Sequence, residues 1–261
     1  MLHPEVSVDD TRAMHRVEGR VIIVTGSGQG VGRGMANHLA KAGATVVVAD
    51  YQPDKARRTR EELAGLGATA LDVEVDIREG PSLHAMVERV VDELGRVDAL
   101  INNAQTFRAN APMAEVVADD LDVFYRSGVL GTLHAMQAVY PHMRAAGWGR
   151  IVNFASSMGR VGGEGFGAYN ASKEAIRALT RTAAREWARD GIVVNAIAPA
   201  AAPPRAVGSL HYEAFMQACP MGRNGDPELD IGPVALFLCS DACRFLTGQT
   251  FMVDGGTYLW S

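Results

Sequence analysis

Short apolar runs alternate with helical patterns along most of this chain. Several of the runs are rich in Val, Ile and Ala with little polar alternation, as in strands that are covered on both faces. The predicted strands are 21–24, 45–49, 70–75, 99–102, 151–154, 193–196 and 250–253. Strands separated by helices form βαβ units, so the sequence predicts an α/β fold: a doubly wound parallel sheet of about seven strands in three α/β/α layers.

The intervals between the predicted strands have helical periodicity. The first predicted helix presents Val31, Met35, Leu39 and Ala40 on one face and ends at Gly43. The other predicted helices are 54–66, 82–94, about 119–145, about 168–190 and 231–238. This pattern fills both faces of the predicted sheet.

The organisation of the chain is that of one domain, because no repeat, low-complexity tract or linker divides it. We expect this domain to span residues 19–261. Residues 1–18 are expected to form an N-terminal extension, either disordered or packed on a neighbour. The irregular segment at about 199–225 is rich in Ala, Pro and Gly and is predicted to be a substrate loop; a plain surface excursion is the alternative.

Composition argues against several classes of partner. The formal net charge of −5 provides no basic surface for nucleic acid or an anionic membrane, and no apolar run has the length of a spanning helix. Residues 1–18 lack the apolar region of a signal peptide, so a cytoplasmic protein is expected. The three cysteines, Cys219, Cys239 and Cys243, have no CxxC spacing and are expected to be reduced thiols rather than disulfides or metal ligands.

The segment TGSGQGVG, residues 25–32, lies between the first predicted strand and the first predicted helix. Glycine permits a tight turn, and the lack of Cβ atoms lets a pyrophosphate lie against the amides of the helix N-terminus. The pattern therefore predicts a dinucleotide site that includes Gly26.

Asp50 ends the second predicted strand and lies 24 residues after Gly26, near the spacing of about 20 expected for a carboxylate that binds a ribose hydroxyl. A carboxylate there accepts hydrogen bonds from a 2′-OH and repels a 2′-phosphate. Neither Gln29 nor Tyr51 is basic, and the arginines at 57–58 lie inside the next predicted helix. These residues favour NAD over NADP; a turn-forming role for Asp50 is the alternative.

Tyr169 and Lys173 lie four residues apart on a predicted helix and therefore share one face. A free tyrosine has a pKa of about 10, and a nearby cation favours its phenolate. Ser156 lies 13 residues before Tyr169, directly after a predicted strand. Ligands bind open α/β sheets at the carboxyl ends of strands, so the three residues form a candidate catalytic set.

From about residue 19 to its C-terminus the chain resembles the short-chain dehydrogenase/reductase family. The matching features are TGSGQGVG, Asp50, Asp76-Ile77, NNAQ at 102–105, Ser156, Tyr169, Lys173, the segment from Asn195 to Pro199 and TGQTFMVDGG. The resemblance implies a Rossmann-like fold, a homotetramer or homodimer built through two long helices, and no metal.

The resemblance also implies catalytic roles and cofactor contacts. Tyr169 would be the general acid/base, Ser156 would hold the substrate oxygen, and Lys173 would bind the nicotinamide ribose and lower the pKa of Tyr169. The predicted cofactor-binding residues are Gly26, Gln29, Gly30, Val31, Asp50, Tyr51, Asp76, Ile77, Asn103, Ala104, Tyr169, Lys173, Pro199 and Ala202.

Two departures from the family lie near this predicted site. Gln105 replaces the last residue of the usual Asn-Asn-Ala-Gly; it either extends a polar group toward nicotinamide or substrate or is a harmless loop substitution. Gly128 takes the position of an asparagine whose main-chain carbonyl serves the family's proton relay. Glycine keeps that carbonyl and permits a local helix irregularity, with Ser127 beside it. Replacement of Gly128 by Asn is expected to leave activity intact or raise it.

Two further departures lie in the segment 198–205. Pro199-Ala200 stands where the family has Pro-Gly, and Pro204 stands where a threonine often contacts the nicotinamide carboxamide. Proline has no hydroxyl, so the carboxamide needs another partner.

The leading hypothesis is an NAD-dependent oxidoreductase that interconverts a secondary alcohol and a ketone. An apolar substrate is suggested by Leu210, Tyr212, Phe215 and Met216 on one wall and by Phe107, Met113 and Met158 on the other, although plain packing is the alternative. Arg160 and His211 are expected to be exposed rather than to bind an anion. Two other hypotheses remain: a dinucleotide-binding sensor or regulatory subunit, and a non-redox member of the family.

Overall fold

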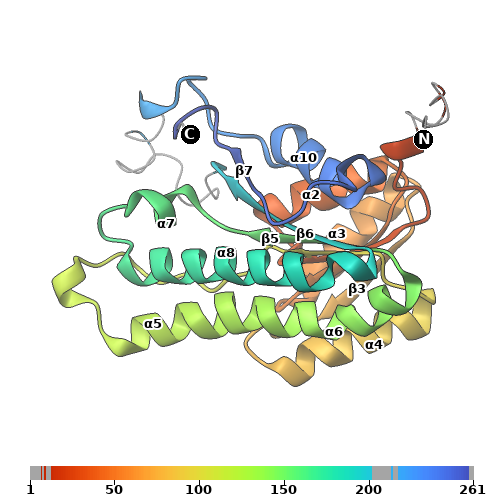
Figure 1. The fold of residues 1–261 in the computed structure, drawn as a ribbon, viewed down its shortest axis with the longest axis horizontal. Helices are drawn as coiled ribbons and strands as arrows, with labels where there is room; N and C mark the ends of the chain where they lie inside the picture. Colours follow the sequence, from red (N-terminus) through yellow and green to blue (C-terminus); the bar gives the residue numbers. More distant parts are fainter. Residues whose placement is uncertain (1–6, 8, 10–12, 202–212, 214–216, 259–261) are drawn as a thin grey trace.

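Seven parallel strands form one sheet in the order β3-β2-β1-β4-β5-β6-β7 in the computed structural model, which describes residues 7, 9, 13–201, 213 and 217–258 (Figure 1). The strands are β1 Val21–Thr25, β2 Thr45–Asp50, β3 Ala70–Glu74, β4 Ala99–Asn102, β5 Gly149–Phe154, β6 Ile192–Pro199 and β7 Thr250–Val253. The predicted fold class, a doubly wound parallel sheet in three layers, is confirmed.

Helices cover both faces of the sheet (Figure 1). The α-helices are α2 Gly30–Lys41, α3 Pro53–Gly65, α4 Gly80–Leu94, α5 Ala118–Phe124, α6 Gly131–Ala146, α7 Ser157–Val161, α8 Gly167–Trp187 and α10 Gly232–Cys239. The shorter helical segments are η1 Met113–Glu115, η2 Tyr125–Leu130, η3 Ala188–Asp190, η5 Pro227–Ile231 and η6 Asp241–Cys243.

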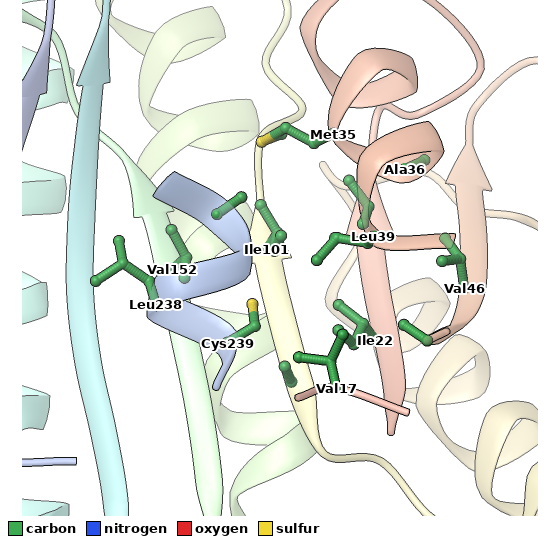
Figure 2. Packing of buried hydrophobic residues seen from close by; sticks show 14 of the residues in the cluster. Val17, Ile22, Met35, Ala36, Leu39, Val46, Ile101, Val152, Leu238 and Cys239 are labelled. Atoms are coloured by element: carbon green, nitrogen blue, oxygen red, sulfur yellow. The ribbon is translucent and has the colours of Figure 1, made fainter. Parts of the chain in front are cut away.

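Consecutive residues of β1 pack into opposite layers, which explains the unbroken apolar run at 21–24. Ile22 and Val24 belong to the layer under α2 and α10, where Leu39 and Leu238 pack (Figure 2). Val21 and Ile23 belong to the layer under α4, α6 and α8. A strand buried on both faces needs apolar residues at every position, so strict alternation is absent.

Two details differ from the prediction. Val17, which the sequence places in the N-terminal extension, is fully buried in the layer under α2 (Figure 2). The helix predicted at about 119–145 consists of α5, the π-helical segment η2 and α6, so the backbone is irregular around Gly128. Of the predicted substrate loop, residues 202–212 and 214–216 lie outside the described residues.

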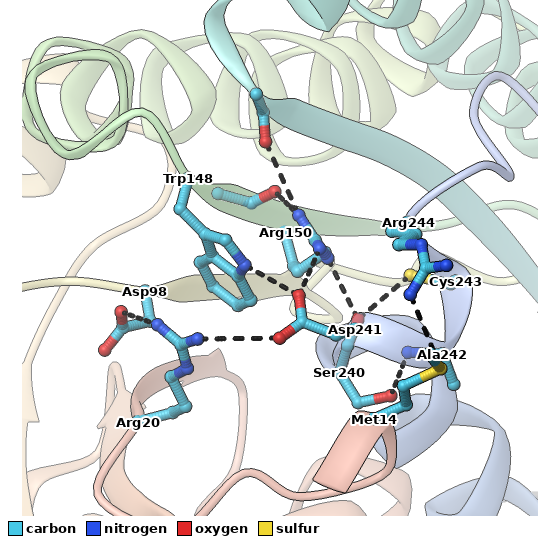
Figure 3. A network of polar contacts seen from close by, with 12 residues as sticks. Met14, Arg20, Asp98, Trp148, Arg150, Ser240, Asp241, Ala242, Cys243 and Arg244 are labelled. Carbon is cyan, nitrogen blue, oxygen red and sulfur yellow. Dashed lines mark hydrogen bonds and ion pairs between the residues drawn. The ribbon is translucent and has the colours of Figure 1, made fainter. Parts of the chain in front are cut away.

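A polar network joins the amino ends of several strands (Figure 3). The Trp148 ring lies between two guanidinium groups, with Arg20 3.9 Å and Arg150 4.2 Å from its centroid. Asp241 accepts hydrogen bonds from Trp148 Nε1 and Arg150 Nη2, both at 2.8 Å. Arg20 also pairs with the buried Asp98 at 3.1 Å. This network lies at the end of the sheet opposite to the predicted cofactor turn.

Candidate active site

The carboxyl ends of β1, β4 and β5 carry the loops that the sequence identified as functional. The glycine-rich turn follows β1, Asn103 and Ala104 follow β4, and Ser156 follows β5. The strand order changes direction between β1 and β4. At such a switch point the neighbouring loops diverge and leave a crevice for a ligand.

The glycine-rich turn runs directly against the loop after β4. Gly26 has a φ of +66°, and a Cβ added there would lie 3.0 Å from the Cα of Ala104. Gly30, with a φ of +57°, begins α2. The first turn of α2 holds no acidic residue and Gln29 makes no capping hydrogen bond, so the helix amides are accessible to an anionic group such as a pyrophosphate.

Asp50 ties the end of β2 to this turn. One of its carboxylate oxygens accepts a hydrogen bond from the Gly28 amide at 2.9 Å, and the other accepts one from the Gln52 amide at 3.0 Å. The side chain is largely buried. Lys55 lies beside it, because a Cβ added to Gly28 would meet both Lys55 Cβ at 2.7 Å and Asp50 Oδ2 at 2.8 Å. Lys55 Nζ donates to Gln29 Oε1 at 2.7 Å.

Asn103 fastens the loop after β4 to β1. Its Nδ2 donates to the carbonyls of Thr25 at 2.9 Å and Gly26 at 3.2 Å. The Thr25 hydroxyl accepts hydrogen bonds from the amides of Asn103 and Ala104, each at 3.1 Å. These bonds satisfy backbone groups that the parallel ladder leaves open and hold the two loops in one arrangement.

A cavity of about 440 Å³ lies between these loops, within the usual size range of a cofactor pocket. Its lining residues are Gly26, Gln29, Asp50, Tyr51, Gln52, Val75, Asp76, Ile77, Arg78, Asn103, Ala104, Gln105 and Thr106. Eight of them are predicted cofactor contacts, and Gln105 is the residue for which a contact with nicotinamide or substrate was one of two alternatives. Gln52, Val75, Arg78 and Thr106 were missed. The predicted contacts Gly30, Val31, Pro199, Tyr169 and Lys173 do not line this cavity, and Ala202 lies outside the described residues.

Arg78 is the most notable of the residues that sequence reasoning missed. Its Nη2 pairs with Asp76 at 2.6 Å, and its guanidinium lies 5.3 Å from the centre of the Tyr51 ring. The hydrogen bond from Arg78 holds the pKa of Asp76 below its usual value. The sequence could have indicated Arg78, because it is a basic residue two positions after the predicted contact Asp76.

The three candidate catalytic residues come together at the end of β5. Ser156 precedes α7 and accepts a hydrogen bond from the Met158 amide at 3.2 Å; its hydroxyl also bonds with the phenol of Tyr169. Lys173 is 5% exposed and donates from Nζ to the carbonyl of Phe154 at 2.8 Å. Its Nζ lies 5.5 Å from the centre of the Tyr169 ring.

Aromatic rings surround Tyr169. The ring centres of Phe107, Phe124 and Phe166 lie 6.0, 5.7 and 6.0 Å from that of Tyr169. The predicted wall residue Phe107 is 44% exposed. These rings make the surroundings of the phenol apolar.

Burial shifts both ionisable groups toward their neutral forms. It raises the pKa of the Tyr169 phenol, and the hydrogen bond with Ser156 lowers that pKa by a smaller amount. Burial also lowers the pKa of the Lys173 ammonium to about 7. Removal from water disfavours a charge of either sign. The net direction for Tyr169 is thus opposite to the lowering expected from Lys173, because desolvation outweighs the hydrogen bond with Ser156.

The remaining predicted substrate residues are placed only in part. Met113 is 76% exposed, and Met158 Sδ accepts a hydrogen bond from the Tyr258 hydroxyl at 3.7 Å. Leu210, His211, Tyr212, Phe215, Met216 and Pro204 lie outside the described residues. Ala200 is held by its amide, which donates to the carbonyl of Val253 at 2.9 Å.

The described residues contain no group of three or more His, Cys, Asp or Glu side chains suited to a metal ion. Within the same part of the chain, no helix has the length and apolar character needed to cross a membrane. All three cysteines are free and buried.

Two kinds of comparison with known proteins agree with this geometry. A family model described as enoyl-(acyl carrier protein) reductase matches residues 26–258. The 12α-hydroxysteroid dehydrogenase of a Clostridium species is 36% identical over 251 residues, which cover 92% of this chain and 96% of that protein. The sorbitol dehydrogenase of Cereibacter sphaeroides is 34% identical and covers 94% of this chain and 99% of its own length.

Solved structures share the fold closely. A 7α-hydroxysteroid dehydrogenase complexed with NADH and 7-oxo glycochenodeoxycholic acid has a TM-score of 0.88 and 33% identity, covering 94% of this chain and 96% of its own. A gluconate 5-dehydrogenase from Burkholderia cenocepacia in complex with NADP and tartrate has a TM-score of 0.89 and 32% identity, covering 95% and 98%. With the family model and the relatives in agreement, this chain belongs to the short-chain dehydrogenase/reductase family.

Proposed function

We propose that this protein is an NAD(H)-dependent oxidoreductase that interconverts a secondary alcohol and a ketone, with Tyr169 as general acid/base. The observation that carries the proposal is the convergence of Ser156, Tyr169 and Lys173 at the end of β5. A cavity of about 440 Å³ opens between the neighbouring β1 and β4 loops. The two features together supply a proton donor and a place for a hydride carrier.

The proton chemistry follows from the surroundings of Tyr169. In ketone reduction the phenol gives its proton to the carbonyl oxygen, which Ser156 holds, and in alcohol oxidation the phenolate removes that proton. A nicotinamide held at this site would supply or accept the hydride at the substrate carbon. The raised pKa of Tyr169 keeps the phenol protonated at neutral pH, which is the form needed for reduction.

Asp50 supports NAD(H) over NADP(H). Its carboxylate is fixed by the amides of Gly28 and Gln52, at the edge of the cavity where a ribose would lie. A 2′-phosphate there would meet a negative charge that cannot turn away. Lys55 is the neighbouring cation that would favour a phosphate, and one related structure is a complex with NADP. Cofactor choice therefore depends on these two opposed charges.

An apolar substrate is proposed because Phe107, Phe124 and Phe166 surround the phenol. Among the relatives, hydroxysteroid dehydrogenases fit this environment better than sorbitol or gluconate dehydrogenases. A cytoplasmic homotetramer or homodimer is proposed on the family resemblance, and light scattering after gel filtration would measure its mass.

The decisive experiment is a substrate panel with NAD⁺ and NADP⁺, run beside a Tyr169→Phe variant. The panel holds hydroxysteroids, simple aliphatic secondary alcohols, sorbitol, gluconate and 3-oxoacyl thioesters. We expect turnover with NAD⁺ on apolar alcohols and its loss in Tyr169→Phe. Tight NADH binding without any turnover would instead indicate the sensor, and chemistry without a change in NADH absorbance would indicate a non-redox member.

A further inference from the structure

The side chain of Gln105 lies directly over Gly128. A Cβ added to Gly128 would lie 2.6 Å from Gln105 Nε2, 3.1 Å from its Cδ and 3.7 Å from its Cγ. Gly128 is buried within the π-helical segment η2. A side chain at position 128 and the amide of Gln105 therefore compete for one volume, and the two departures from the family pattern are coupled in space.

The amide of Gln105 also reaches the helix that carries Tyr169. Gln105 Nε2 donates to Ser172 Oγ at 3.1 Å, and Ser172 Oγ donates to the carbonyl of Tyr169 at 2.8 Å. A serine hydroxyl has one hydrogen, and here it is given to Tyr169, so the amide must act as the donor toward Ser172. This chain of two bonds links the loop after β4 to the main chain of Tyr169.

The surroundings of these two hydrogen bonds restrict the movement of Gln105 and Ser172. Ser172 is fully buried, and Gln105 lies between Ala104 and Thr106 on the cofactor cavity. The Oε1 atom of Gln105 is buried and has no hydrogen-bond partner among the described residues. A buried acceptor without a hydrogen bond is costly. Gln105 Oε1 therefore remains available to a donor group of the cofactor or substrate.

We propose that Gln105 is a positioning residue for Tyr169, and that position 128 must be glycine for the Gln105 amide to reach Ser172. The inference rests on the proposed function: the hydrogen bonds from Gln105 through Ser172 hold Tyr169, the proposed general acid/base, in place. It also changes the expectation for Gly128→Asn. With Gln105 present, an asparagine displaces the Gln105 amide from Ser172, so activity falls rather than staying intact.

The test is a set of matched variants of the 261-residue chain with bound NAD(H). Gly128→Ala adds only the competing Cβ, Gln105→Gly removes the amide, and Gln105→Met keeps the volume without hydrogen bonds. The double variant Gln105→Gly with Gly128→Asn returns an amide to the same volume from the opposite side. Gly65→Ala is the control, because a Cβ there meets nothing within 4 Å.

We expect kcat to fall about tenfold in each of Gly128→Ala, Gln105→Gly and Gln105→Met, because a small misplacement of a reacting group slows the reaction strongly. For Gly128→Ala, whose changed residue does not line the cofactor cavity, NADH affinity measured by fluorescence titration should change by less than about threefold, which separates positioning from cofactor binding. The apparent pKa of the kcat profile should move in these single variants and return in the double variant. The effects of Gln105→Gly and Gly128→Asn on kcat are also measured singly. Single effects that multiply in the double variant, or a Gly128→Ala enzyme with full kcat and an unmoved profile, would overturn the proposal.

Thermal unfolding keeps this test separate from the proposed function. The loss of Tm caused by Gly128→Ala, about 2–4 °C per kcal/mol for a chain of this size, should vanish in the Gln105→Gly background. If the wild type turns over no substrate, the proposed function fails, whereas this coupling still reports the contact. Equal Tm losses in both backgrounds would show that the two residues are independent.

Discussion

Lys173 donates a hydrogen bond from Nζ to the main-chain oxygen of Phe154, the last residue of β5, at 2.8 Å. The bond holds an almost fully buried ammonium between the central sheet and the ring of Tyr169. A carbonyl is a neutral partner, so it satisfies a hydrogen without compensating the charge. Burial therefore dominates and lowers the pKa of Lys173 to about 7.

Replacement of Lys173 by Met should lower kcat about 100-fold or more, the lower range for loss of a group that supports proton transfer. Met fills a similar volume, so the fold is expected to survive, and circular dichroism checks this. Steady-state kinetics on the best alcohol measures the loss. Lys41→Met, an exposed lysine paired with Glu228, is the control and should keep wild-type kcat. A Lys173→Met enzyme with kcat near wild type would contradict the assignment.

The same lysine makes stability depend on pH. Its folded pKa of about 7 lies below the unfolded value of about 10.4, so between these values the unfolded chain binds more protons. The free energy of unfolding of the wild type relative to Lys173→Met should therefore rise with pH across this window, by at most about 1.4 kcal/mol per pH unit. Urea titrations at pH 7, 8 and 9 measure the difference. A difference that stays flat, as Lys41→Met is expected to give, would argue against the lowered pKa.

The direction of catalysis should also respond to pH. Alcohol oxidation needs the phenolate of Tyr169, whose pKa is raised by burial, so kcat/KM for oxidation should increase with pH into the alkaline range. Ketone reduction needs the protonated phenol and should lose rate over the same range. Initial rates in both directions from pH 6 to 10 test this, with Tyr169→Phe as the inactive reference. Parallel profiles in the two directions would remove Tyr169 from the role.

Much of this molecule was predictable because its local signals agree with one another. Each run buried on both faces, such as 21–24, predicts a strand. Asp50 is placed by the strand that it ends, and Ser156 by the strand that it follows. Parallel strands bring their carboxyl ends to one edge, so residues far apart in sequence were correctly expected there. The predicted roles of these residues stay predictions.

Other features depend on contacts that a single sequence does not display. Gln105 and Gly128 are 23 positions apart, and nothing in either segment indicates that one fills the space over the other. Burial raises the pKa of Tyr169, and the three phenylalanine rings that lie around it come from separate segments. The short helix α7 was missed because its five residues are too few for a periodic pattern.

Replacement of Asp50 by Ser should shift cofactor preference. Without the carboxylate, the ratio of kcat/KM for NAD⁺ to that for NADP⁺ should fall about tenfold or more, equal to about 1.4 kcal/mol of discrimination. Much of the gain with NADP⁺ should depend on Lys55, so it should be smaller in a variant that also carries Lys55→Met. Asp54→Ser, the same change at an exposed residue paired with Arg57, is the control. An unchanged ratio in Asp50→Ser would show that the carboxylate does not select the cofactor.

Asp241 holds the buried guanidinium of Arg150 and the indole of Trp148 at the amino ends of the strands (Figure 3). Asp241→Ala removes the only carboxylate that the described residues bring within salt-bridge distance of Arg150, which is 3% exposed. Arg150 retains the carbonyls of Gly149 and Ser240, so the expected loss is that of charged hydrogen bonds, about 1.5–3 kcal/mol. Urea unfolding measures the loss.

The matched control for Asp241→Ala is Asp54→Ala, which breaks an exposed pair and should change stability by less than about 0.5 kcal/mol. The network lies at the opposite end of the sheet from Tyr169, so kcat at 25 °C should equal that of the wild type while the protein is folded. A reduced kcat together with unchanged stability would contradict a purely stabilising role of this network and would connect it to the active site.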